Sequence, residues 1–222
     1  MKVKGEIINP HVYSLTFDTK YELCMSFVRM QEFYESQKFR NKYFTLEEFI
    51  DYWANEFGHG TFDYPARWNG FNLPSNVVSK WTNLFFDHMR EREETILNEI
   101  GACRFREDNV EQNGKYYVIG VHAESSEESR LEVVEHETAH AFYYIYPAYK
   151  RAVNKLLGEL PKKEYGIAEK KLFEMGYGKN VAKDEMQAYF STNMTFVGDK
   201  TYPLSGRREF SDCFKSFKSK IK

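Results

Sequence analysis

The run His136-Glu137-Thr138-Ala139-His140 constrains this chain more than any other feature, because its side chains converge only if the segment is helical. Residues four apart lie on one helical face, so both imidazoles point the same way, and Glu137 lies one step round the helix. Two imidazoles and a nearby carboxylate are the ligands and the base that a zinc site uses. The run therefore predicts a zinc-bearing helix, with His136 and His140 as ligands and Glu137 as general base.

The flanking sequence supports this helix and predicts that the two histidines face inward. Ser125, with Glu128 three residues later, is a candidate N-cap, and Pro147 ends the segment. Between them apolar residues recur at helical spacing beside the histidines, so we expect buried imidazole rings. The stripe consists of Leu131, Val134, Thr138, Ala141 and Ile145.

The segment before this helix has the composition of a strand. Residues 115–122 are rich in Tyr, Val and Ile and follow the turn-forming pair Asn113-Gly114. We therefore expect a strand that leads directly into the helix.

The strand followed by the histidine helix resembles the active site of the zincin metallopeptidases, specifically the gluzincins. In that group two helix histidines and a glutamate from a later helix hold zinc, so the resemblance implies zinc-dependent peptide hydrolysis. It also implies that strand 115–122 is an edge strand that pairs with extended substrate. The metzincin variant is excluded, because its spacing requires Gly where this chain has Tyr143 and His where it has Tyr146.

The third ligand is expected in a later helix over residues 180–190, after the breaker run 176–178. Glu185 is the predicted ligand, since a carboxylate on a largely apolar helix face is costly unless it is paired or metal-bound. Asp184 remains the alternative. It is the ligand itself, a solvated carboxylate beside Lys183, or a partner that fixes the tautomer of His136 or His140.

Hydrolysis of a carbonyl also needs a donor to the oxyanion, a role that a Tyr or His beside the metal can fill. The sequence does not choose among several candidates. These are His122, Tyr143, Tyr144, Tyr177, Tyr189 and Tyr202.

Length and composition indicate a globular α+β protein that is mostly helical. The 222 residues, 42% of them hydrophobic, suit a single compact domain, with an N-terminal lobe over residues 1 to about 100 and a zincin-like metal-site lobe over about 101–222. The resemblance places a small sheet and the active-site helix in the second lobe.

The N-terminal half predicts further elements. Residues 1–20 read as one or two strands, and Tyr21–Glu35 reads as an amphipathic helix whose polar face, including Arg29, is solvated. Thr45 opens a capping box before another helix. We expect an irregular aromatic loop over Tyr64–Pro74, and then one long helix from Ser75 to Ile100, stopped by Gly101.

Charge and cysteine usage bear on partners and location. The formal net charge of −2 gives no general attraction to nucleic acid or anionic lipid, so a protein or peptide substrate is the expected partner. Three scattered cysteines, and no apolar run long enough for a membrane span, predict a cytoplasmic protein that does not contact a membrane. The oligomeric state is left open.

Two alternatives stay open beside the hydrolase. One is a metal-free interaction domain that uses the aromatic loop around Trp68 and Phe71. The other is a nucleic-acid-associated factor that uses the basic C-terminal tail, residues 214–222.

Overall fold

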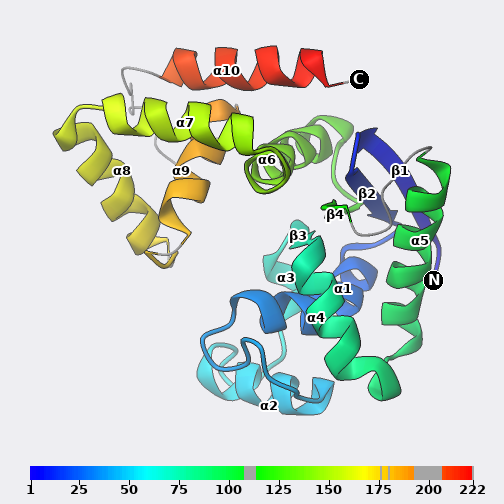
Figure 1. Ribbon diagram of the computed structural model, residues 1–222. Coiled ribbons are helices and arrows are strands. Elements are labelled where there is room, and N and C mark those ends of the chain that lie inside the picture. The colour runs from blue at the N-terminus through cyan, green and yellow to red at the C-terminus, as the bar shows by residue number, and fades with distance from the viewer. Residues whose placement is uncertain (108–113, 176, 180, 193–206, 222) are drawn as a thin grey trace. The chain divides into compact units, whose positions relative to one another are not determined.

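The computed structural model of the chain is α+β and mostly helical, as the sequence predicts. It divides into two compact units, Met1–Arg130 and Leu131–Lys222, called here the N-terminal and the C-terminal unit (Figure 1). No described helix is both long and apolar enough to cross a membrane. The described residues are 1–107, 114–175, 177–179, 181–192 and 207–221.

The N-terminal unit is built on a mixed sheet with the strand order β1-β2-β4-β3. β1 and β2 form an antiparallel hairpin, β4 runs parallel to β2, and β3 runs antiparallel to β4. Residues 1–20, expected to form one or two strands, form two. The strands are β1 (Val3–Asn9), β2 (Val12–Phe17), β3 (Gly70–Pro74) and β4 (Tyr117–His122).

The strand before the histidine helix is confirmed as β4, but its expected place at the edge of a sheet is wrong. β4 is bonded to β2 on one side and to β3 on the other, and all six of its residues are buried. Its apolar residues face both sides of the sheet, which is typical of a central strand. A peptide therefore cannot add to β4 through backbone pairing.

The irregular loop expected over Tyr64–Pro74 is also corrected. The segment forms a short helix, α3 (Tyr64–Arg67), and then β3, whose Phe71 is buried in the core. Trp68, between the two elements, is 46% exposed. The two aromatic residues of this segment therefore have opposite environments.

Helix α1 (Lys20–Glu35) lies close to the central strand because β4 carries a glycine there. Its N-cap is Thr19, whose Oγ1 accepts a hydrogen bond from the Glu22 backbone N–H. A Cβ placed on Gly120 would lie 2.7 Å from the Phe27 ring and 2.8 Å from Leu23. The missing side chain therefore makes room for these two core residues.

Arg29 of α1 does not lie on a solvated face, contrary to the expectation from the sequence. Its side chain is 3% exposed and forms a bidentate ion pair with Glu93. It also donates to the carbonyl oxygen of His88 at 2.8 Å. The partner is far away in sequence, so helical periodicity alone could not reveal it.

The single helix expected from Ser75 to Ile100 is wrong. The chain forms α4 (Ser75–Phe85), a 3-10 turn η1 (Phe86–His88) and then α5 (Glu91–Arg106), within which Gly101 lies. The capping box predicted at Thr45 is confirmed, and it opens α2 (Leu46–Glu56).

The break between α4 and α5 has a tertiary cause. Glu93 accepts a hydrogen bond from the backbone N–H of Arg90 at 2.8 Å and so caps the start of α5. The same carboxylate holds Arg29, which in turn donates to the carbonyl of His88. A buried ion pair thus stabilises the non-helical link between two helices.

The described part of the C-terminal unit is helical, and the small sheet expected in the C-terminal lobe lies instead in the N-terminal unit. Phe142 packs on Phe214 and Phe217, so the aromatic residues of the C-terminal tail face the core. The helices are α6 (Glu127–Ile145), which begins in the N-terminal unit, α7 (Pro147–Glu159), α8 (Lys162–Glu174), α9 (Ala182–Ser191) and α10 (Arg207–Lys220).

Candidate metal centre

Helix α6 presents both motif histidines on its buried side. The cap is one residue later than expected, since the Oγ of Ser126, rather than Ser125, accepts from the Ser129 backbone N–H. His136 and His140 are each 4% exposed, with ring centroids 5.0 Å apart. The inward orientation predicted from the apolar stripe is confirmed.

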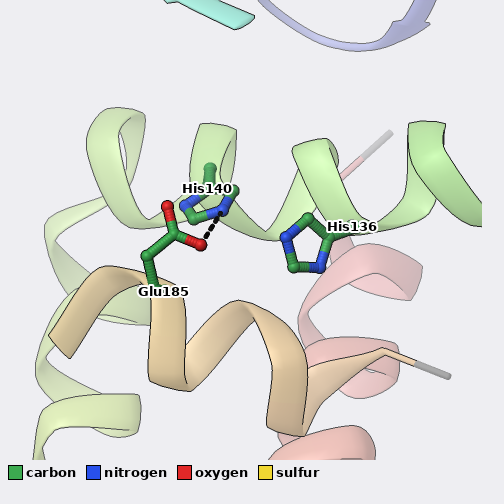
Figure 2. Close-up of side chains that lie close together, drawn as sticks. All are labelled: His136, His140 and Glu185. Carbon is green, nitrogen blue, oxygen red and sulfur yellow. Dashed lines mark ion pairs between the residues drawn. The ribbon is translucent and has the colours of Figure 1, made fainter. Parts of the chain in front are cut away.

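Helix α9 brings Glu185 to these two rings (Figure 2). One potential ligand atom from each of His136, His140 and Glu185 lies within 4.8 Å of the other two. Glu185 Oε2 is 3.6 Å from His140 Nε2. The structure therefore brings together the three side chains that the sequence predicts as metal ligands.

Asp184 contacts the other nitrogen of the same ring. Its Oδ1 lies 2.8 Å from His140 Nδ1. A carboxylate in this position accepts the Nδ1 proton and fixes the tautomer in which Nε2 faces Glu185. Of the three roles that the sequence left open for Asp184, this geometry matches the partner that orients a histidine.

His136 has a comparable partner in Thr192, which follows the end of α9. The Thr192 hydroxyl donates to the Ala188 carbonyl at 2.9 Å, and its oxygen lies 3.4 Å from His136 Nδ1. Because the hydroxyl proton is directed to the carbonyl, the oxygen is left to accept from His136 Nδ1. The proton on Nδ1 leaves Nε2 of His136 with a lone pair.

The two histidines differ strongly in their affinity for protons. Burial lowers the pKa of His136 well below its ordinary value, and the adjacent His140 lowers it further, so His136 is neutral at pH 7. Burial also acts to lower the pKa of His140, but the carboxylates of Glu185 and Asp184 outweigh burial and raise that pKa well above its usual range. The cluster thus attracts a cation to His140, and a metal ion competes with a proton there.

The cluster fits a metal ion in its chemistry. Glu185 Oε2 is buried and has no hydrogen-bond partner among the described residues; it lies 3.6 Å from His140 Nε2 and forms an ion pair with that ring when the ring is protonated. A metal ion bound between the two groups would replace this proton. Two imidazole nitrogens and one carboxylate oxygen form a donor set that zinc accepts. Tetrahedral zinc needs these atoms about 3.4 Å apart, so side-chain shifts on the order of 1 Å would close the cluster.

Gln187 supports the centre, and the sequence reasoning missed it. Its fully buried amide donates to Asp184 Oδ1 at 3.1 Å and to the Ala139 carbonyl at 3.2 Å, and its oxygen accepts from Tyr149 at 3.0 Å. It therefore ties α9 to α6 and α7. An uncharged amide carries no motif signal; only its position on the Glu185 helix, one turn after Asp184, distinguishes it.

Two of the candidate oxyanion donors lie beside the cluster. The Tyr189 ring centroid is 4.6 Å from that of His136, and the Tyr189 hydroxyl is 3.4 Å from that of Tyr177. Burial, and then the neighbouring acidic groups that include Glu185 and Glu137, raise the pKa of Tyr177, and burial also raises that of Tyr189. Both phenols therefore keep their protons and can donate.

Of the other described candidates, two belong to α6 and one belongs to the N-terminal unit. Tyr143 donates to Asn154 Oδ1 at 3.0 Å, and Tyr144 is half-buried on the same helix. His122 belongs to the N-terminal unit, where its Nε2 lies 3.2 Å from the Ser125 hydroxyl. Tyr202 lies outside the described residues.

Comparison with known proteins adds no relative from which a role could be transferred. No protein-family model matches the chain, and neither a curated protein nor a solved structure does. The resemblance to the gluzincins therefore rests on the motif and on the residues gathered around it.

Proposed function

We propose that the chain is a zinc-dependent hydrolase that cleaves peptide bonds at the centre formed by His136, His140 and Glu185. The observation that carries the proposal is this cluster itself, with a buried Glu185 oxygen that lacks a hydrogen-bond partner among the described residues. A bound zinc ion would lower the pKa of a coordinated water to about 7 and polarise the carbonyl of the substrate.

The residues of this chain would divide the remaining work. Glu137 would accept the proton of the attacking water and deliver it to the amine as the carbon–nitrogen bond breaks. Tyr189, with Tyr177 behind it, would donate a hydrogen bond to the oxygen that becomes negatively charged. Asp184 would hold His140 in the tautomer that coordinates through Nε2. Water is consumed, and a carboxylate and an amine are released.

Hydrolysis of a peptide mixture by the purified protein tests the proposal. We expect a chelator to abolish cleavage and added zinc to restore it. Glu137→Gln should keep its zinc and lose at least about a hundredfold in turnover, the scale of general-base catalysis. Glu132→Gln, an exposed carboxylate change on the same helix, is the matched control and should cleave normally.

Two results would speak against the hydrolase. Full activity in Glu137→Gln would mean that the assigned base is wrong. A protein that binds no zinc and cleaves nothing would instead favour the metal-free interaction domain.

A further inference from the structure

A second feature of the C-terminal unit is a cavity of about 690 Å³ between α7 and α8, reached also by the last turn of α6 and the start of α9. This volume is in the range of small-molecule sites. The rings of Tyr143 and Tyr165 and the side chains of Leu157 and Leu160 provide apolar surface. The cavity is therefore suited to a ligand with an apolar body.

The polar groups that line the cavity are hydrogen-bond donors. Lys162 and Lys183 form no ion pair with any described carboxylate. Asn154 uses its oxygen to accept from Tyr143, so its amide nitrogen remains to donate. No described Asp or Glu lines the cavity. Two ammonium groups and an amide, without a carboxylate among them, favour an anion.

Two glycines line the cavity, and the backbone conformation does not require glycine at either position. A Cβ at Gly158 or at Gly166 would meet no atom within 4 Å, and neither residue has a positive φ. Glycine within a helix costs about 1 kcal/mol relative to alanine. The fold does not need these glycines for packing, but a ligand in the cavity would use the space that they leave.

We propose that this cavity binds a carboxylate carried on an apolar body, which is the chemistry of a peptide's C-terminal residue. The cavity adjoins the candidate metal centre, because Tyr143 lies one turn after His140 and Lys183 directly precedes Asp184. A role for the cavity in holding the C-terminal end of a peptide substrate depends on the proposed hydrolase function. Binding of a carboxylate in the cavity does not depend on that function.

Titration with N-acetyl-L-leucine and with N-acetyl-L-leucinamide, followed by NMR on the full-length protein, tests the proposal. We expect saturable binding of the acid and at least tenfold weaker binding of the amide, which has the same apolar body without the charge. Gly158→Leu should remove binding by filling the cavity, and Lys162→Ala should weaken binding of the acid at least fivefold.

Two matched variants control for fold and charge. Gly101→Leu inserts the same side chain on α5, also where a Cβ would meet no atom, and Lys163→Ala removes the exposed neighbour of Lys162. Both should bind the acid as the wild type does. Equal binding of acid and amide, no binding of either, or unchanged binding in Lys162→Ala would overturn the proposal.

A substrate subsite and a site for a free carboxylate differ in one further result. If the protein cleaves peptides, amidation of the peptide C-terminus should lower kcat/KM at least tenfold in the wild type for a substrate subsite. Unchanged kcat/KM, together with binding of the free acid, would identify a site for a small carboxylate. Because the NMR titration requires no turnover, its outcome is independent of the hydrolase proposal.

Discussion

At the scale of single residues, the candidate centre depends on which acid faces which nitrogen of His140. Asp184 lies at Nδ1 and Glu185 lies at Nε2, so two adjacent carboxylates have separate roles. The ring between them is fixed in orientation, and Gln187 holds the Asp184 oxygen from behind. The centre is therefore ordered by contacts that lie outside the three ligand atoms.

Asp184→Asn should weaken zinc binding without disturbing the fold. The amide keeps the shape of the carboxylate but loses the charge that makes His140 a stronger ligand, so we expect a 10- to 100-fold loss of zinc affinity. Competition with a chelating dye measures this loss, and circular dichroism checks the helix content. Asp212→Asn, an exposed change on α10, is the control. Equal zinc affinity in Asp184→Asn and the wild type would show that Asp184 does not support the centre.

The sequence predicted these residues unequally, for physical reasons. His136 and His140 follow from helical spacing, and Glu185 follows from the cost of a carboxylate on an apolar face. The side on which Asp184 meets His140 depends on how α9 packs against α6, which no local pattern encodes. Gln187 is neutral and belongs to no motif, so its role emerges only from its contacts.

At the scale of elements, the close packing of α1 on β4 rests on Gly120. We expect Gly120→Ala to lower the free energy of unfolding by about 1–3 kcal/mol, because the added methyl group overlaps Phe27 and Leu23. Urea unfolding measures the change. Gly101→Ala is the matched control, and its effect on stability should have the opposite sign. A Cβ at position 101 would meet no atom, and alanine favours the helix, so the free energy of unfolding should rise by up to about 1 kcal/mol. A Gly120→Ala variant as stable as the wild type would mean that α1 is less closely packed than described.

Local sequence patterns predicted which helices and strands are present better than they predicted which strands pair or where a helix ends. Residues 115–122 were identified as a strand, but whether a strand is central or at an edge depends on β3, which comes from a segment that resembles a loop. The end of α4 was missed because the chain turns there around the buried pair Arg29 and Glu93. Both errors arise from long-range contacts.

At the scale of the whole molecule, a half-buried carboxyl in the N-terminal unit links stability to pH. Burial raises the pKa of Glu32 to about 7, against hydrogen bonds from Tyr64 and Ser36 that act to lower it. In the unfolded chain this group titrates near its ordinary value of about 4.3. At a pH between these two pKa values, the folded state therefore keeps a proton on Glu32 that the unfolded state has already released.

The sign of the pH effect follows from this difference in bound protons. Stability from the protonated Glu32 is fully present below the unfolded pKa, and it is lost as the pH rises to about 7. Glu32→Gln stays neutral, so at pH 8 it should exceed the wild type in unfolding free energy by on the order of 3–4 kcal/mol. Denaturation curves at pH 8 and pH 4.5 measure the difference, which should nearly vanish at the lower pH. A difference independent of pH would show that Glu32 does not titrate in this way.

The most direct test of the central claim is the zinc content of protein purified without a histidine tag, measured by elemental mass spectrometry. We predict one equivalent of zinc in the wild type, none in His136→Ala or Glu185→Ala, and one in the controls His88→Ala and Glu174→Ala, which alter side chains that are not part of the cluster. If zinc is lost in His136→Ala but kept in Glu185→Ala, the third ligand is a residue other than Glu185. A protein without zinc even after refilling would contradict the metal centre.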